Sequence, residues 1–316
     1  MTSNTLIKVK IWALLAMPLL LASTCEKPVT FKVDPPAPDL LVSSNFQDQS
    51  AIQVEVSKIT YDAIGVGQKE FINDALVGIY ENDNLLEELQ VVYPNTPRGQ
   101  ALYSSSDIVP TIGKEYLIQV EVEGFKMVTA RSIIPPRVDI QEFAIGQVEV
   151  TPAQETNLVF YSFPVYIAYD DPTGERNYYH LKIAQEIVEF SIIEGDTLPS
   201  RSFRRNINFS SDLDDNFVNA YFAGGVLLQD DPFGGQYGFD MNIAINPAFQ
   251  KLGSLFVELR TVSEEYYRFH NSLDRIEQQG GNTGGFQESV IPYNNIENGS
   301  GIFAGYTSAV DSITVQ

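Results

Sequence analysis

The sequence has few of the residues that build covalent cross-links or catalytic sites. Its 316 residues include one cysteine, two histidines and one tryptophan, and its 20 Lys and Arg residues are outnumbered by 41 Asp and Glu residues. A single cysteine excludes an intramolecular disulfide, so the fold must rest on its core. The formal net charge of -21 argues against nucleic acid, whose phosphates need neutralising by Lys and Arg. It also argues against direct binding to anionic lipid headgroups.

The one cysteine lies directly after a short apolar segment near the N-terminus. Lys8 and Lys10 precede the apolar residues 11–22, and small residues then lead to Cys25. This order is typical of a secretory signal peptide. With cysteine as the first mature residue, it is typical of a bacterial lipoprotein signal. We therefore expect residues 1–24 to be removed, the Cys25 thiol to carry a diacylglycerol, and the freed amine to carry an acyl chain such as palmitate.

Other roles for this cysteine fit less well. A membrane-spanning helix needs about 20 apolar residues, whereas residues 11–22 are fewer and include Pro18. A buried structural cysteine needs folded sequence on both sides, and a reactive thiol has no histidine near it in sequence. Ala22 and Thr24 replace the leucine and the glycine or alanine that are usual before a lipidated cysteine. Simple secretion therefore stays the alternative to lipidation.

The rest of the chain predicts a mostly β fold, because aromatic and β-branched residues lie in short alternating runs between turn residues. Residues 25–39 join the acylated cysteine to a Pro-rich tether. Residues 40–134 are expected to form an immunoglobulin-like or fibronectin-like sandwich of roughly seven strands. Pro135 and Pro136 interrupt the pattern, so residues 138–316 are expected to form a larger C-terminal β-rich domain with one helix.

The predicted helix has clear ends. Thr261 or Ser263 can cap its start, two glutamates suit its first turn, and Gly280 with Gly281 ends it. An apolar stripe at helical spacing predicts the face that packs on the protein. The stripe consists of Tyr266, Phe269, Leu273 and Ile276.

Both histidines are expected to be structural. Alternation around His180 places Tyr179 and Leu181 inside and turns His180 outward, while His270 flanks the apolar stripe of the helix. A Ser-His-Asp triad needs a base held by a carboxylate beside the nucleophile, and the Gly-x-Ser-x-Gly elbow is absent from the sequence. We therefore expect no catalytic residue, no cofactor and no His/Cys zinc site.

Acidic loops are the remaining metal candidates. An EF-hand starting at Asp212 would need glycine and glutamate where Phe217 and Ala223 stand, so that motif fails. An irregular calcium site stays open beside a simple solvated acidic loop. Its ligands would come from Asp212, Asp214, Asp230 and Asp231.

Glycan chemistry is the alternative function. Paired carboxylates can hydrolyse glycosides, but their separation decides the reaction and the sequence does not supply it. Aromatic residues set among glycines can stack on sugars, dock a partner or lie in the core. They are Tyr221, Phe222, Phe233 and Tyr237. A free-standing surface protein that binds or hydrolyses glycans therefore stays open, the hydrolase being a carboxylate-based glycoside hydrolase.

Two C-terminal segments resemble a known family. Residues 258–269 contain Ser-x-Glu-Tyr-Tyr at the predicted helix start, and residues 294–306 contain Asn-Ile-Glu-Asn-Gly-x-Gly-Ile-Phe. Both resemble domain of unknown function 4249, a family of predicted outer-membrane lipoproteins of Bacteroidota. The Pro135-Pro136 break and Asn177-Tyr178-Tyr179 extend the resemblance over nearly the whole mature chain.

The resemblance implies a non-enzymatic lipoprotein anchored in the cell outer membrane by its lipid. It also implies an accessory or ligand-binding role beside a TonB-dependent transporter, by analogy with other family members. The family provides no established catalytic residue to transfer. Whether the protein faces the periplasm or the cell surface is left open, because Glu26-Lys27 only weakly resembles the acidic tail that marks surface export.

Overall fold

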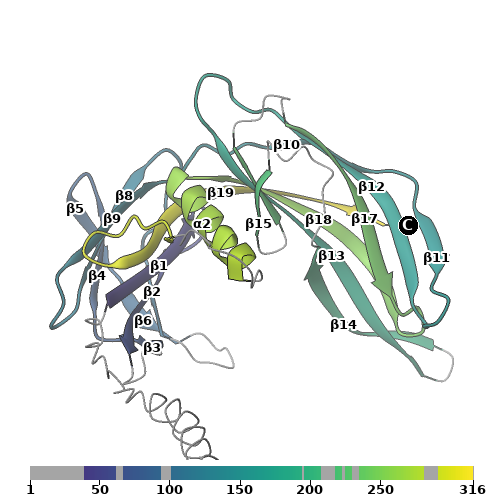
Figure 1. Cartoon of the computed structure of the whole chain (residues 1–316), viewed down its shortest axis with the longest axis horizontal. Coiled ribbons are helices and arrows are strands. Elements are labelled where there is room, and N and C mark those ends of the chain that lie inside the picture. The colour runs from purple at the N-terminus through teal and green to yellow at the C-terminus, as the bar shows by residue number, and fades with distance from the viewer. Residues whose placement is uncertain are drawn as a thin grey trace, which may run out of the picture. The chain divides into compact units, whose positions relative to one another are not determined.

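The computed structural model describes residues 39–61, 67–93, 101–193, 196–207, 218–222, 225–229, 235–280 and 291–315. All of them belong to one compact unit, Ala37–Gln316. Strands dominate this unit, which confirms the predicted mostly β fold (Figure 1). Among these residues, none of the helical segments is long and apolar enough to cross a membrane.

The N-terminal part is a sandwich of two sheet layers, as predicted. One layer contains β1 (Asp39–Gln47), β2 (Gln53–Tyr61), β3 (Gly67–Phe71), β6 (Gln90–Val92) and β7 (Leu102–Ser104). The other has the order β5 (Asn84–Glu88), β4 (Leu76–Glu81), β8 (Glu115–Glu121) and β9 (Val128–Ile133). Alternate residues of both layers form a shared core, as period-2 burial requires.

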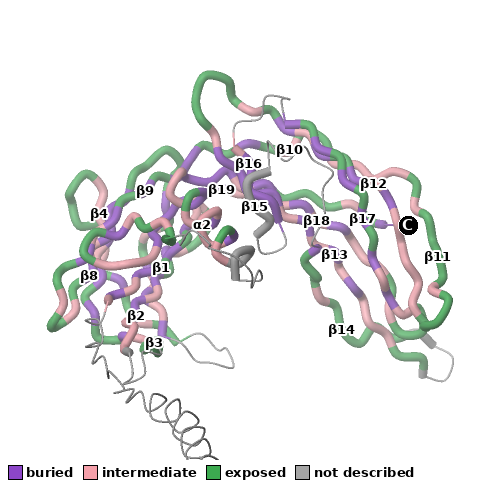
Figure 2. Tube along the Cα trace, viewed as in Figure 1, coloured by how far each residue is buried: buried purple, intermediate pink, exposed green. Residues whose placement is uncertain are grey.

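The C-terminal part packs a second pair of sheet layers around its own core. A four-stranded sheet contains β10 (Ile140–Ile145), β11 (Glu149–Pro152), β12 (Val159–Tyr169) and β17 (Gln236–Ile245). The facing layer contains β13 (Tyr178–Ile193), β14 (Asp196–Asn206), β15 (Val218–Phe222), β16 (Gly225–Gln229), β18 (Gln250–Val262) and β19 (Ser300–Thr314). Figure 2 shows buried residues gathered along β12, β13, β17 and β18.

Strand β19 belongs to both parts. Its first half pairs in parallel with β1, from Leu41↔Ser300 onward, and its second half pairs antiparallel with β18, ending at Ser254↔Thr314. The described strands of the two parts therefore share one continuous sheet, and Pro135 and Pro136 lie just after β9 in the connection between them. The predicted domain boundary at residues 134–138 stays a prediction.

Helix α2 (Glu264–Gly280) ends at the predicted glycine and begins after Ser263. Of the two predicted caps, Ser263 is correct: its Oγ accepts a hydrogen bond from the Tyr266 main-chain N at 3.3 Å. Thr261 instead ties the chain together elsewhere, because its Oγ1 accepts the Val138 main-chain N at 3.1 Å. The helix packs against one face of the larger sheet through Tyr266 and Tyr267 (Figure 1).

Candidate functional site

Most of the predicted site residues lie outside the described residues. This holds for Cys25 and for the calcium candidates Asp212, Asp214, Asp230 and Asp231. Lipidation and calcium binding therefore stay predictions. Within the described ranges, His, Cys, Asp and Glu side chains do not gather in threes in a way that could hold a metal ion.

The four aromatic candidates have different positions. Tyr221 and Phe222 belong to β15, and Phe233 lies outside the described residues. Tyr237 is buried in the C-terminal core, with its ring centroid 5.9 Å from that of Tyr169 in a stacked arrangement. Tyr237 therefore lies in the core and does not form part of a surface that stacks on sugars or docks a partner.

His180 is buried, which corrects the prediction that it faces outward. The alternation itself is right, since Tyr179 and Leu181 are buried in the core on the other face of β13. The face that carries His180 is covered by α2, and the His180 Nδ1 lies 2.9 Å from the Tyr266 hydroxyl in a hydrogen bond. A period-2 pattern gives the two faces of a strand, but it does not show what covers the second one.

Tyr266 is the centre of a polar cluster between α2 and the sheet. Its hydroxyl accepts a hydrogen bond from Arg260 Nη1 at 3.3 Å, in addition to the bond with His180. Its ring lies 4.3 Å from the His270 ring, and the Nε2 of His270 lies 3.5 Å from Asn45 Nδ2. Burial, assisted by the charge of Arg260, lowers the pKa of His270 to about 4. His270 is therefore neutral at neutral pH.

An ion pair completes this polar cluster on the sheet. The guanidinium of Arg260 binds Glu258 through two hydrogen bonds, Nε to Oε1 at 2.7 Å and Nη2 to Oε2 at 3.2 Å. Ser308 Oγ donates to Glu258 Oε1 at 2.9 Å. Burial tends to raise the pKa of Glu258, but the bonds from Arg260 and Ser308 outweigh it and hold that pKa low.

Lys182 adds a second cation beside the same carboxylate. Its Nζ lies 4.0 Å from Glu258 Oε2. Burial and then the charge of Arg260 lower the pKa of Lys182, and the attraction of Glu258 offsets this only in part. The hydrogen bonds and ion pair of the polar cluster thus fix its charges in place and bind α2 to the sheet.

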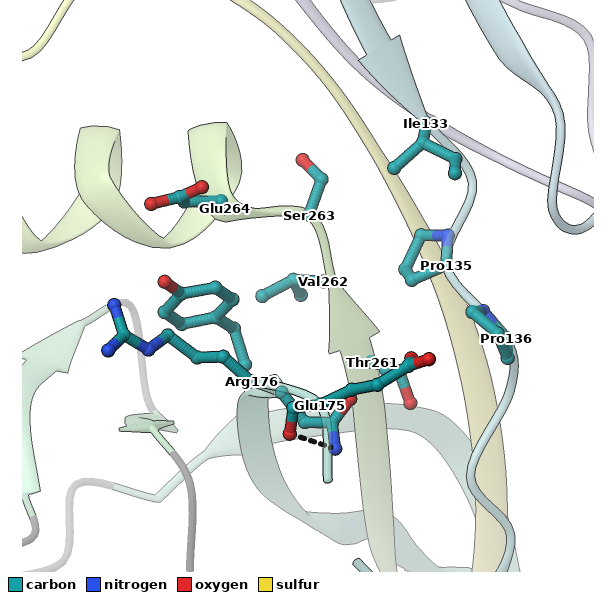
Figure 3. A pocket seen from close by; sticks show the side chains of 11 residues that line it. Ile133, Pro135, Pro136, Glu175, Arg176, Thr261, Val262, Ser263 and Glu264 are labelled. Atoms are coloured by element: carbon teal, nitrogen blue, oxygen red, sulfur yellow. Dashed lines mark hydrogen bonds between the residues drawn. The ribbon is translucent and has the colours of Figure 1, made fainter. Parts of the chain in front are cut away.

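A cleft opens at the start of α2 (Figure 3). It has a volume of about 530 Å³. One wall contains Ile133, Pro135 and Pro136, and the other contains Arg176 and Glu264. Glu175 also lines the cleft, so apolar ring surface faces one cationic and two anionic side chains. This combination suits a small polar ligand or an extended peptide segment.

Tyr178 links the charged groups of the cleft. Burial raises the pKa of Tyr178, and its side chain hydrogen-bonds with Arg176, which lowers that pKa, and with Glu264, which raises it. Glu264 also forms an ion pair with Arg268 one helical turn further on. The charged wall is therefore ordered by its own contacts before any ligand arrives.

Sequence reasoning found the parts of this cleft but not the cleft. It identified Pro135-Pro136 as a break and Ser263 as a helix cap, while the fold brings these distant segments together. Ser132 Oγ lies 3.1 Å from Ser263 Oγ in a buried hydrogen bond, which holds the two walls in place. The signal that linked them was the resemblance, which included both segments.

Comparison with known proteins adds a family. A family model described as Domain of unknown function (DUF4249) matches residues 26–312. The matched range contains both sandwich-like parts, the polar cluster and the cleft. No curated protein matches the chain.

Proposed function

The chain belongs to the DUF4249 family, and on that premise we propose that it is a lipid-anchored accessory or ligand-binding component of the cell outer membrane. In this proposal it works beside a TonB-dependent transporter and is not an enzyme. We further propose that it comes from Bacteroidota. The proposal leaves both the periplasmic and the surface face of the membrane open.

The observation that carries the proposal is the order of residues before Cys25. Two lysines, a short apolar run and small residues lead directly to the one cysteine in the chain. Stable anchoring takes two membrane-binding signals, and a diacylglycerol thioether provides two acyl chains on one residue. The prolines at 35, 36 and 38 would then space the folded part from the bilayer.

The cleft at the start of α2 supports a binding role. Its walls are held by the Ser132–Ser263 and Val138–Thr261 hydrogen bonds, and its charged side chains are positioned by Tyr178. A preformed site binds with a smaller ordering cost than a site that must be assembled by its ligand. This arrangement favours recognition of a small polar ligand or a peptide.

The alternative is a free-standing glycan-binding or glycan-hydrolysing protein. A glycosidase general acid needs a raised carboxyl pKa. Glu87, Glu186 and Glu258 each have a lowered carboxyl pKa, so none of these three suits the role of a glycosidase general acid.

Fractionation of cells tests the anchor. The protein should stay with outer membranes until detergent is added, and Cys25→Ala should move it into soluble fractions. Thr24→Ala is the matched control, because it changes a neighbouring residue and leaves the acylated thiol in place. Membrane retention of the Cys25→Ala protein would disprove the anchor.

Capture of the native lipoprotein tests the partner. Outer membranes solubilised gently should give a stoichiometric complex with a large β-barrel receptor, identified by mass spectrometry. If the captured lipoprotein carries no stoichiometric partner, even after mild crosslinking, the result would support the free-standing glycan-binding or glycan-hydrolysing alternative. The two experiments separate the anchor from the partner, since either can fail without the other.

A further inference from the structure

Strand β14 concentrates positive charge on the edge of a sheet. Arg201, Arg204 and Arg205 lie within five residues of a chain whose formal net charge is -21. Among the described strands, β14 pairs with β13 alone. Its other edge therefore presents main-chain N–H and C=O groups that the described strands do not pair, the arrangement to which an extended peptide can add.

The three arginines are exposed, and each has an uncharged neighbour. The Arg201 Cζ lies 5.1 Å from the centre of the Phe203 ring, and the Arg204 Cζ lies 3.6 Å from that of Phe256. Arg205 Nη2 donates to the Ala244 main-chain O at 3.1 Å. A guanidinium stacked on a ring keeps its in-plane N–H donors available for a carboxylate.

Ion pairing sets these arginines apart from most other cations of the protein. Within the described ranges, Arg131, Arg137, Arg260 and Arg268 each form an ion pair with a carboxylate. In the same ranges, the salt bridges of 4.0 Å or less include none made by the three arginines of β14. At longer range Arg204 attracts Glu186, its cross-strand neighbour on β13, and Arg201 lies across from Glu189. Their charge is thus partly balanced within the protein, while no direct ion pair at 4.0 Å or less occupies their N–H donors in the described ranges.

The arginines lie on both faces of a regular stretch of strand. The register with β13 shifts before Arg201 and then runs unbroken from Glu189↔Arg201 to Ala184↔Asn206. Alternation places Arg201 and Arg205 on one face and Arg204 on the other. A strand that adds to this edge thus meets a cation on each of its faces. Figure 2 shows most of β14 exposed.

We propose that β14 is a docking edge for an extended acidic segment of a partner protein. The segment adds as a strand beside β14, and its carboxylates accept hydrogen bonds from Arg201, Arg204 and Arg205. Charge complementarity selects this occupant, because opposite charges in cross-strand positions stabilise a strand pair. A second copy of the chain is disfavoured, because β14 paired with β14 brings arginines beside arginines. This edge shares no residue with the cleft and does not depend on the lipid anchor, so the inference goes beyond the proposed function.

Charged residues also protect sheet edges from aggregation, and this competing role predicts no partner. The two roles are separated by a peptide-binding experiment on the full-length lipoprotein in detergent micelles. The probe is a fluorescent peptide of about ten residues in which pairs of adjacent glutamates alternate with pairs of threonine or valine, so that carboxylates lie on both faces of the added strand. Two matched peptides serve as controls. One has glutamine in place of glutamate, and one is N-methylated at alternate residues, which removes the N–H groups of a strand.

The glutamate peptide should bind, and fluorescence anisotropy should show affinity that falls with added salt. The double variant Arg201→Glu with Arg204→Glu should weaken binding by at least about tenfold. Arg137→Glu, which reverses an exposed arginine outside β14, should leave it unchanged. Circular dichroism of the variants checks that the fold is kept, and the two control peptides test the wild-type protein directly.

Three results would overturn the inference. Absence of binding by the glutamate peptide would assign the arginines to edge protection alone. Equal binding of the N-methylated peptide would show surface attraction without strand addition. Arg137→Glu changes the net charge by half as much as the double variant. A loss of binding free energy from Arg137→Glu that is half that of the double variant would therefore show that the affinity follows net charge and not this edge.

Discussion

The side chain of Asn295 forms both hydrogen bonds of a strand partner with the main chain of Phe303. Its Nδ2 donates to the Phe303 O at 2.8 Å, and its Oδ1 accepts the Phe303 N at 3.1 Å. Phe303 lies in the half of β19 that pairs with β1, and its ring stacks on Phe46 with centroids 4.4 Å apart. The Asn-Ile-Glu-Asn-Gly motif at residues 295–299, which carried the family resemblance, therefore helps to hold β19 in the N-terminal sandwich.

Replacing Asn295 should destabilise this closure. Asn295→Ala removes the two hydrogen bonds with Phe303, and also the bond from Asn295 Nδ2 to the Arg131 main-chain O at 3.3 Å. The Phe303 main-chain amide and carbonyl are left without their Asn295 partners. We expect the free energy of unfolding to fall by about 1–3 kcal/mol, measured by urea denaturation. Asn73→Ala is the control, because that exposed side chain makes one hydrogen bond of 3.3 Å with Tyr93. Equal losses in the two variants would contradict the closing role.

Gly301 should tolerate no side chain. Its φ is 122°, and a Cβ added there would overlap the Val42 carbonyl oxygen of β1. Gly301→Ala should therefore push β19 away from β1 and cost more than about 3 kcal/mol of unfolding free energy. Gly124 separates crowding from backbone strain, since it has a φ of 84° and open space around its added Cβ. Gly124→Ala should cost about 1 kcal/mol. Similar losses at the two positions would disprove the close approach.

Glu87 should anchor the loop that follows β7. Its Oε1 accepts Ser106 N at 2.6 Å and Ser106 Oγ at 2.8 Å, and its Oε2 accepts Asp107 N at 3.1 Å and Ile108 N at 3.0 Å. Burial tends to raise the pKa of Glu87, but these bonds outweigh it, and the pKa is lowered. A lowered carboxyl pKa contributes stability above the unfolded-state pKa and loses it as the pH falls through the folded-state value.

Glu87→Gln should weaken this loop, because an amide can accept at one end only. We expect a loss of about 1 kcal/mol at neutral pH, since solvent screens part of the interaction. Glu88→Gln, at the exposed next position of β5, should change the free energy of unfolding by less than about 0.5 kcal/mol. Amide hydrogen exchange at Asp107 and Ile108 gives a local measurement. Unchanged protection there in Glu87→Gln would contradict the anchoring role.

Local patterns predicted the elements of the fold well. Alternation identified β13 and its inner residues Tyr179 and Leu181, and capping chemistry identified Ser263 and Gly280 as helix ends. These features depend on neighbours within a few residues, so the sequence displays them directly.

Long-range relationships were not visible in local patterns. The return of β19 to β1 joins residues more than two hundred positions apart, and the covering of His180 by Tyr266 depends on where α2 lies. The candidate site has the same limitation. Pro135 and Glu264 line one cleft only because the fold brings their segments together.

The buried His270 should make the protein lose stability in mild acid. Burial lowers its pKa from 6.5 to about 4, and Arg260, Tyr266 and Asn45 surround its ring. The unfolded chain binds a proton at His270 below its ordinary pKa, whereas the folded protein does not until about pH 4. Stability from this group is therefore full above pH 6.5 and falls as the pH drops toward 4. Between pH 7 and pH 5 the loss should be about 2 kcal/mol.

Urea denaturation at the two pH values measures this loss, and His270→Gln should remove most of it whatever its effect at pH 7. Glu87→Gln is the control. The Glu87 carboxyl has a lowered pKa and titrates below this window, so replacing it should leave the difference in unfolding free energy between pH 7 and pH 5 unchanged. An NMR titration of the His270 ring in the folded protein gives the pKa itself. A midpoint near 6.5, or an unchanged pH dependence in His270→Gln, would show that burial under α2 does not keep this imidazole neutral.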